Sequence, residues 1–187
     1  MKYRIFRSIY ILFTTCTILL NSTSSHAASK EYALKAAFIE KFPRFISWPH
    51  NNSTQEPDTI FNICVIGKNP FNGMLDKVAS ISTIKNNPVL VKQITVIDKI
   101  SRCQILFIAT TTNDRLRKIL AQTKGQPILT ISDTTGYAQH GVLINFYPRK
   151  NSIGFEINKR ASEQSRLSIS SRLLKLSRIV ESSGDKP

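Results

Sequence analysis

Between residues 60 and 132 the chain alternates short runs of aliphatic and β-branched residues with amphipathic helical segments. The expected strands lie at 60–67, 89–97, 103–109 and 127–132. The expected helices lie at 70–79, capped by Asn69, and at 112–124, capped by Thr112 or Asn113. The run 105–108 is apolar throughout, as in a strand that is covered on both faces. Because helices that alternate with strands usually pack on the faces of a mainly parallel sheet, this segment predicts an α/β fold.

The C-terminal third predicts a hairpin followed by helices. Two strand-like runs, 142–147 and 152–157, flank the turn sequence 148–151 and indicate an antiparallel hairpin at the edge of the sheet. Asn158 then starts a helical stretch, and the buried face of the last helix is expected to hold Ile169, Leu173, Leu176 and Val180. We therefore expect a single α/β domain: a largely parallel mixed sheet, helices on both faces, and a C-terminal β-hairpin and helix.

Residues 1–27 have the three-part layout of a secretory signal peptide, with three basic residues, an apolar run at 9–20 and a small residue, Ala27, at the expected cleavage point. The apolar run is about a dozen residues long, whereas a membrane-spanning helix requires about 20, so a retained anchor is less favoured. Lipidation at Cys16 is also less favoured, because the preceding residues do not form a lipoprotein signal. We expect export to the periplasm and one mature domain at 28–187.

The chain is strongly basic, with 26 Lys and Arg against 12 Asp and Glu and a formal net charge of +14. Three basic residues leave with the signal segment, which lowers the net charge of the mature chain to +11. An exported protein meets little nucleic acid, so we expect no nucleic-acid partner. Anionic lipid headgroups, cell-wall polymers and an acidic protein remain as partners, beside the alternative of a simple solvated surface.

Two cysteines, Cys64 and Cys103, remain after export. An even number of cysteines in an oxidising compartment predicts a disulfide. In the chain-entropy model this disulfide stabilises the fold by up to about 4 kcal/mol. The alternative is a pair of buried free thiols, the usual state in a reducing cytoplasm. We expect the disulfide.

Residues suited to catalysis or metal binding are scarce in the mature sequence. His50 and His140 are too few for a histidine-rich metal cluster, and we expect no metal site and no cofactor. Gly67 and Lys68 lack the rest of a phosphate-binding loop, and no Gly-x-Ser-x-Gly nucleophile motif occurs. Asp133 follows a strand, where α/β sheets often bind ligands, but its surroundings are more typical of a turn. We expect no catalytic residues and predict that the protein is not an enzyme.

Residues 29–48 predict a helix, capped by Ser29, whose apolar surface is wider than one ordinary stripe. Pro43 is expected to kink or divide this helix. Either the helix is sandwiched between other elements, or part of its apolar face contacts another chain. The second alternative predicts a protein interface made of Phe38, Phe42, Phe45 and Trp48.

Short motifs run in order along nearly the whole mature chain. They lie at residues 32–38, 45–49, 65–67, 70–71, 103–108, 127–133, 141–146, 155–158 and 170–176. Each motif alone is typical of many α/β proteins, but the ordered set behind a signal peptide resembles the YfiR family. The resemblance implies a periplasmic α/β domain that tends to form a homodimer.

The resemblance also implies two protein partners. The first is an inner-membrane diguanylate cyclase, YfiN-like, whose periplasmic portion the repressor binds, so that cyclic di-GMP falls and biofilm formation is restrained. The second is an outer-membrane OmpA-like lipoprotein, YfiB-like, which captures the repressor and relieves the restraint. On this basis the chain is expected to be a regulatory binding protein.

An alternative from another functional class is a periplasmic small-ligand-binding sensor of another envelope signalling or transport system. Its ligand would carry an anionic group, bound by Arg172, Lys175 or Arg178 of the last predicted helix. Neighbouring genes distinguish the two functions, because a GGDEF-domain gene supports the repressor and a transporter gene supports the sensor.

Overall fold

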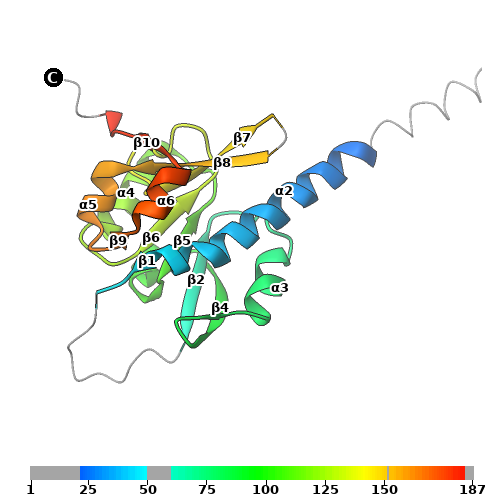
Figure 1. Cartoon of the computed structure of the whole chain (residues 1–187), viewed down its shortest axis with the longest axis horizontal. Coiled ribbons are helices and arrows are strands. Elements are labelled where there is room, and N and C mark those ends of the chain that lie inside the picture. The colour runs from blue at the N-terminus through cyan, green and yellow to red at the C-terminus, as the bar shows by residue number, and fades with distance from the viewer. Residues whose placement is uncertain (1–21, 50–59, 151, 184–187) are drawn as a thin grey trace, which may run out of the picture.

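A computed structural model describes residues 22–49, 60–150 and 152–183, and its centre is an eight-stranded mixed sheet (Figure 1). The strands are β2 (Phe61–Ile66), β3 (Thr83–Ile84), β4 (Asn87–Ile94), β5 (Ile105–Ile108), β6 (Leu129–Ser132), β7 (Ile144–Arg149), β8 (Ser152–Asn158) and β10 (Arg178–Val180). Across the sheet they lie in the order β10-β8-β7-β6-β5-β2-β4-β3. The predicted single α/β domain is confirmed.

Five neighbouring strands, β4, β2, β5, β6 and β7, are parallel to one another. The chain passes from β2 to β4 on one side, then crosses to β5 on the other side and continues to β6 and β7. This is a doubly wound strand order. The segments between consecutive parallel strands cross over the sheet and return the chain to the edge where the next strand begins. The predicted hairpin is also present, since β7 and β8 pair antiparallel from Ile144 opposite Ile157 to Arg149 opposite Ser152.

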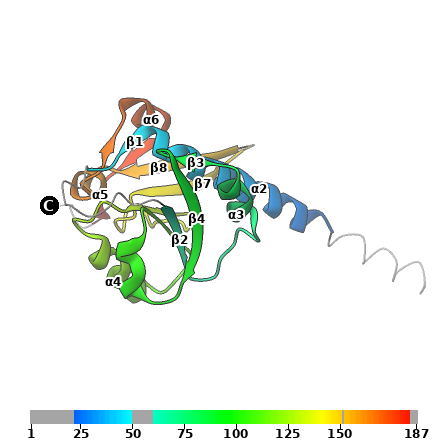
Figure 2. The same ribbon diagram turned by 90° about the horizontal axis from the view of Figure 1, so that it is seen from below.

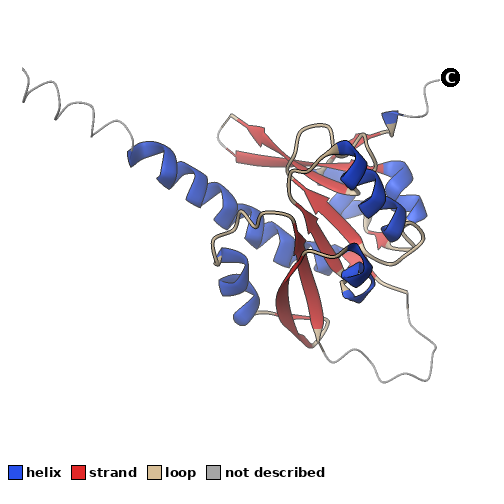
Figure 3. Cartoon of the chain, turned by 180° about the vertical axis from the view of Figure 1, so that it is seen from behind, coloured by secondary structure: helices blue, strands red, loops and turns tan. Residues whose placement is uncertain are grey.

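Helices cover both faces of the sheet, as predicted (Figures 2 and 3). One face carries α2 (Ser22–Lys41), the 3-10 helix η1 (Phe42–Phe45) and α3 (Met74–Ser80). The other face carries η2 (Ile97–Arg102) and α4 (Asn113–Thr123). Two short helices, α5 (Lys159–Gln164) and α6 (Ser171–Leu176), follow the hairpin, and β1 (Ile46–Ser47) pairs with β9 (Ser168–Ile169).

The sheet has an apolar core on each face. Phe107 and Phe146 belong to the core beneath α2 and α3, whereas Leu106, Leu116 and Ile119 belong to the core beneath α4. Successive residues of a strand point to opposite faces, so the four buried residues of β5 serve both cores. This double burial accounts for the unbroken apolar run in the sequence.

Two helix starts and one helix end follow the local sequence signals. Thr112 caps α4, with its Oγ1 accepting a hydrogen bond from the Arg115 amide at 3.4 Å. Asn158 caps α5, with its Oδ1 accepting from the Ala161 amide at 2.8 Å. Pro43 divides the first helical stretch, because α2 ends before it and Pro43 lies in η1.

Two predicted helix starts are wrong. Helix α2 begins at Ser22, so Ser29 lies within it and does not cap it. Asn69 does not cap α3 either, because its Oδ1 accepts from the Phe71 amide at 2.9 Å in a turn and the helix begins at Met74. Ser29 thus lies inside a helix and Asn69 in a turn before one, although both residue types are typical of caps.

Helix α2 overlaps the predicted signal peptide, because its first turns lie at residues 22–27. Figure 1 shows this end of α2 projecting beyond the sheet. The rest of the predicted signal segment, with Cys16 and the apolar run, lies outside the described residues, as does His50. The signal peptide therefore stays a prediction.

The last predicted helix is shorter than expected. Helix α6 ends at Leu176, and the chain then forms β10, which pairs parallel with β8. Leu176 is consequently 70% exposed, although the helical pattern placed it on a buried face. Pairing with a strand that lies 20 residues or more earlier in the chain outweighs the local helical pattern here.

Candidate functional site

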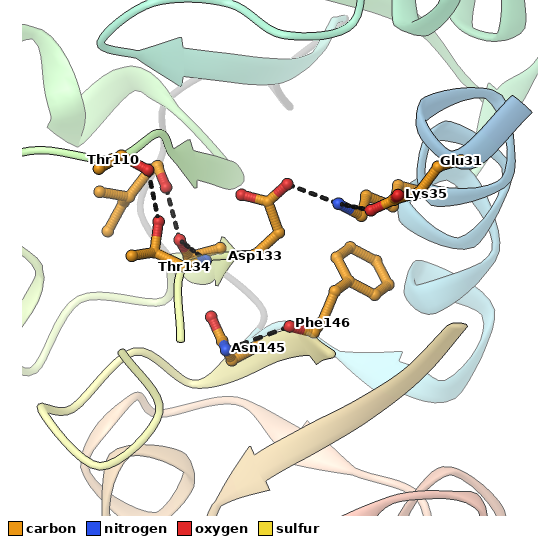
Figure 4. A network of polar contacts seen from close by, with 9 residues as sticks. Glu31, Lys35, Thr110, Asp133, Thr134, Asn145 and Phe146 are labelled. Atoms are coloured by element: carbon orange, nitrogen blue, oxygen red, sulfur yellow. Dashed lines mark hydrogen bonds and ion pairs between the residues drawn. The ribbon is translucent and has the colours of Figure 1, made fainter. Parts of the chain in front are cut away.

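Lys35 joins α2 to the carboxyl edge of the parallel strands. Its Nζ lies 2.6 Å from Asp133 Oδ2 and 2.6 Å from Glu31 Oε1 (Figure 4). The Lys35 side chain is 6% exposed and that of Asp133 is 11% exposed, whereas Glu31 is about half exposed. A buried charge is costly unless it is paired, so this contact holds α2 over the strand ends.

Asp133 also acts on Tyr32, which lies beside Lys35. The Lys35 ammonium lies over the Tyr32 ring, 4.3 Å from the ring centroid. Burial, followed by a hydrogen bond with Asp133 and its negative charge, raises the pKa of the Tyr32 hydroxyl. The phenol therefore stays protonated well above neutral pH and donates to the carboxylate.

Polar side chains beside Asp133 form hydrogen bonds within the chain, but the buried Oδ1 of Asn145 has no hydrogen-bond partner among the described residues. Thr110 Oγ1 and Thr134 Oγ1 lie 2.9 Å apart, and the Asn145 side-chain amide donates to the Phe146 carbonyl at 3.2 Å (Figure 4). Sheets of this type commonly bind ligands outside the carboxyl ends of their strands. Here α2 and its ion pair lie at that position, so Asp133 anchors a helix, a role that its turn-like sequence did not reveal.

Replacing Lys35 by Met should lower the free energy of unfolding by about 2 kcal/mol, because Asp133 loses its buried partner. Urea unfolding followed by circular dichroism measures this loss. The double variant Lys35→Met/Asp133→Leu should recover most of it, since no unpaired buried carboxylate remains. Glu31→Gln removes the exposed partner and should cost less than about 1 kcal/mol. Equal losses for Lys35→Met and Glu31→Gln would show that the buried pair does not anchor α2.

The predicted disulfide is confirmed. Cys64 on β2 and Cys103 before β5 are bonded, with their α-carbons 5.8 Å apart. Both residues are buried in the core beneath α4. The bond therefore ties two neighbouring central strands together at the face opposite α2.

Phe42, one of the four predicted interface residues, belongs to the core instead. It is 1% exposed, and its ring centroid lies 5.8 Å from that of Phe146 and 5.2 Å from that of Phe155. Its assignment to an interface is therefore wrong. The apolar surface of the first helical segment is wide because that segment packs on the sheet and against α3 at the same time.

Phe38, Phe45 and Trp48, the other three residues of the predicted interface, are partly buried and pack against the same core. The Trp48 ring packs edge-on to Phe61, with centroids 5.5 Å apart, and Lys85 lies over the Trp48 ring at 5.2 Å. These contacts use part of each ring and leave part exposed. A protein interface at these three residues stays a prediction.

The C-terminal part of the chain presents apolar and basic side chains together. We call this group the C-terminal surface, and its members are Arg172, Leu174, Lys175, Leu176 and Ile179. Leu174 is 37% exposed, Leu176 70% and Ile179 46%. Ile179 lies on β10, the outermost strand of the sheet, whose free edge is not paired with any described strand. Exposed apolar residues beside an unpaired strand edge are typical of protein-binding surfaces.

Arg178, predicted to contact an anionic group, is paired within the chain. Its guanidinium forms an ion pair with Glu156, whose side chain is 4% exposed, and lies 4.3 Å from the Tyr147 ring centroid. Tyr147 in turn covers Gly154, where an added Cβ would lie 2.4 Å from the ring. The positive charge of Arg178 thus compensates a buried carboxylate.

Arg172 and Lys175 are exposed on α6, and no ion pair joins either of them to a described residue. Contact of these two residues with an anionic ligand or partner stays a prediction. The Glu156 ion pair was not predicted from the sequence, although a carboxylate between two apolar residues of a strand, Phe155 and Ile157, is a signal for a buried partner.

Residues 22–49, 60–150 and 152–183 contain no group of three or more His, Cys, Asp and Glu side chains placed to bind a metal ion. Within the same ranges, none of the helices has the length and hydropathy that a bilayer span requires. The expectation of no catalytic and no metal-binding residues stays a prediction.

These features define a small, disulfide-linked α/β domain with a doubly wound parallel core. The chain belongs to the YfiR/HmsC-like family, which it matches over residues 32–178. At the level of the family, this places it among periplasmic, non-catalytic regulators of cyclic di-GMP signalling that interact with YfiN-like partners. The match begins in α2 and ends at Arg178, so it includes both partners of the ion pairs Lys35–Asp133 and Arg178–Glu156.

Comparison with solved structures supports the fold. One similar structure is described as the ABC domain in complex with L-Trp from Streptococcus pneumonia, with a TM-score of 0.50 and 8% sequence identity. The alignment covers 80% of this chain but only 60% of that one, and at this identity it bears on the fold alone. No curated protein matches the chain.

Proposed function

We propose that this protein is a periplasmic repressor of an inner-membrane diguanylate cyclase. Residues 1–27 direct export, and residues 28–187 bind the periplasmic portion of a YfiN-like cyclase and hold it inactive, which lowers cyclic di-GMP. A YfiB-like outer-membrane lipoprotein captures the repressor, which acts as a homodimer. The observation that carries the proposal is the family match over residues 32–178.

A repressor without catalysis acts across the membrane by binding one state of a spanning partner more tightly than the other. A 100-fold preference, equivalent to about 2.7 kcal/mol, moves a balanced equilibrium almost completely to the inactive state. The basic surface of the chain favours encounter with an acidic periplasmic segment and makes that encounter sensitive to salt. The mechanism therefore needs only a surface of the right shape and charge.

The C-terminal surface is the best candidate for this contact. Leu176 and Ile179 offer exposed apolar area, Arg172 and Lys175 offer positive charge, and β10 offers free backbone groups at the edge of the sheet. An extended, partly acidic segment of the cyclase would add to such an edge by backbone hydrogen bonds, with its side chains on these residues. This arrangement supports a partner that binds through both apolar and charged contacts.

Deleting the gene should raise cyclic di-GMP and biofilm formation, and deleting the neighbouring cyclase gene as well should abolish the rise. Complementation with Leu176→Glu or Ile179→Glu should fail to restore repression, because a carboxylate there opposes an acidic partner. Quantification of cyclic di-GMP by mass spectrometry measures each strain.

Ile81→Glu is the matched control, since Ile81 is 85% exposed and precedes β3 at the opposite edge of the sheet. This variant should repress as well as the native protein does. Periplasmic levels of all three variants are compared by immunoblot. Unchanged cyclic di-GMP in the deletion strain, with the cyclase expressed, would refute the repressor function. Full repression by both surface variants would refute the location of the surface.

A further inference from the structure

Strand β4 has a free edge along most of its length. Residues 89–94 pair with β2 on one side, whereas on the other side β3 pairs only with Asn87 and Pro88 (Figure 2). Along a strand, every second residue directs its N–H and C=O groups to the same side. About half of residues 89–94 therefore direct these groups to a side that no described strand occupies. This β4 edge lies at the opposite end of the sheet from β10.

A hollow of about 390 Å³ lies beside the β4 edge. Its lining includes Lys92 and Ile94 of β4, Cys64 of β2, and Lys99 and Arg102 of η2. Cys64 and Ile94 belong to the core beneath α4, so the hollow opens on that face of the sheet. A strand added to the β4 edge would thus have every second side chain directed to the hollow.

The charged side chains that line the hollow are all basic. They are Lys92, Lys99 and Arg102, and no ion pair joins any of them to a described residue. Asp98, the acidic residue of η2, is exposed and does not line the hollow. A carboxylate that entered the hollow would therefore meet three cations that have no acidic partner among the described residues.

We propose that an extended acidic segment of another protein adds to β4 as a further strand. Every second side chain of the segment would lie on the face of Lys92, and these side chains would be carboxylates. The others would lie on the face of Val89 and Val91, which are partly buried and pack against the core beneath α2 and α3, so they would be apolar. Backbone hydrogen bonds provide affinity in such an addition, and the alternating side chains provide specificity.

Charge and backbone geometry favour this occupant over two others. A second copy of the chain would bring another basic β4, with its own Lys92, to the edge of a protein of formal net charge +14, and like charges on paired strands destabilise the pairing. An anionic lipid surface would contact the basic side chains but would offer no strand to the free backbone groups. The β4 edge is separate from the C-terminal surface, and its use does not depend on the proposed repression of a cyclase.

The test is a titration of the ¹⁵N-labelled protein with an acetylated, amidated peptide of sequence TVEVEVET, followed by two-dimensional NMR. The peptide should shift the resonances of residues 89–94 and of η2 saturably, with a Kd of about 1 mM or tighter. The peptide TVKVKVKT, which reverses the charge, should bind at least about 10-fold more weakly. Two further forms of the acidic peptide are N-methylated, one at every valine and one at every glutamate. Only one of these two sets of amides can face β4, so only one form should lose binding.

The double variant Lys99→Glu/Arg102→Glu should weaken binding of the acidic peptide by at least about 10-fold. Lys118→Glu/Lys124→Glu is the matched control, because it changes the net charge equally at exposed lysines that do not line this hollow. It should change the Kd by less than about 2-fold. Thermal unfolding verifies that each variant is folded. Equal effects of the two double variants, equal effects of the two methylations, or no saturation up to about 10 mM would overturn the proposal.

Two further measurements identify the other occupants. Shifts of residues 89–94 that depend on protein concentration, without peptide, would indicate a second copy at the β4 edge. Co-sedimentation with phosphatidylglycerol vesicles that Lys99→Glu/Arg102→Glu abolishes, in a protein that does not bind the acidic peptide, would indicate a lipid surface. Either result would overturn the proposal.

Discussion

Replacing Cys64 and Cys103 together by alanine should lower the free energy of unfolding by about 4 kcal/mol. The bond closes a loop with a sequence separation of 39, and in the chain-entropy model such a cross-link restricts the unfolded chain by about this amount. The two strands that it connects are neighbours in the centre of the sheet, so their pairing depends on that loop remaining closed. Urea unfolding of the oxidised native protein and of the variant measures the difference.

Native protein treated with a reductant is the control for this prediction. When unfolded, the reduced native chain has the same conformational freedom as the double variant. When folded, it still keeps the two sulfur atoms in the core. Its stability should lie close to that of the variant, within about 1 kcal/mol. A double variant as stable as the oxidised native protein would show that the sheet does not need the cross-link.

Replacing Phe42 by alanine should lower the free energy of unfolding by about 3 to 5 kcal/mol. Phe42 is 1% exposed, and its ring contacts Phe38, Phe146 and Phe155, so truncation removes buried area and leaves a cavity where α2 meets the sheet. Urea unfolding measures the loss, and the near-ultraviolet circular dichroism of the aromatic cluster should weaken with it.

Phe45→Ala is the matched control for Phe42→Ala, because both residues lie on η1 and only Phe42 is fully buried. Phe45→Ala should cost about 1 to 2 kcal/mol, in proportion to the smaller apolar area that it buries. Equal losses in the two variants would contradict the assignment of Phe42 to the core and of Phe45 to its margin.

Much of the fold was predictable because its signals are local. The caps of α4 and α5 depend on Thr112 and Asn158 and on amides three residues later, and the hairpin depends on the turn between two strand-like runs. The unbroken apolar run of β5 predicted burial on both faces, which the structure confirms. Each of these features is decided within about 15 residues of sequence.

The failed predictions for Arg178 and Phe42 required knowledge of distant contacts. Arg178 was assigned to a helix because its neighbours follow a helical pattern, but pairing with β8 gives it a buried carboxylate, Glu156, as its partner. Phe42 and Phe45 look alike in sequence, yet Phe42 is fully buried in the core and Phe45 only partly buried against it. The two sides of a short helix are distinguished only by what packs against them.

By itself the sequence determined the α/β class, the caps of α4 and α5, the hairpin, the cysteine pair and the family of this protein, since these depend on residue types, their periodicity and their order along the chain. The tertiary structure decided the doubly wound strand order, the salt bridge between Lys35 and Asp133 across 98 residues, and the core position of Phe42. A periodic pattern of apolar residues involves residues that are close in the chain. Burial and the pairing of charges depend instead on which distant segments meet once the sheet has formed.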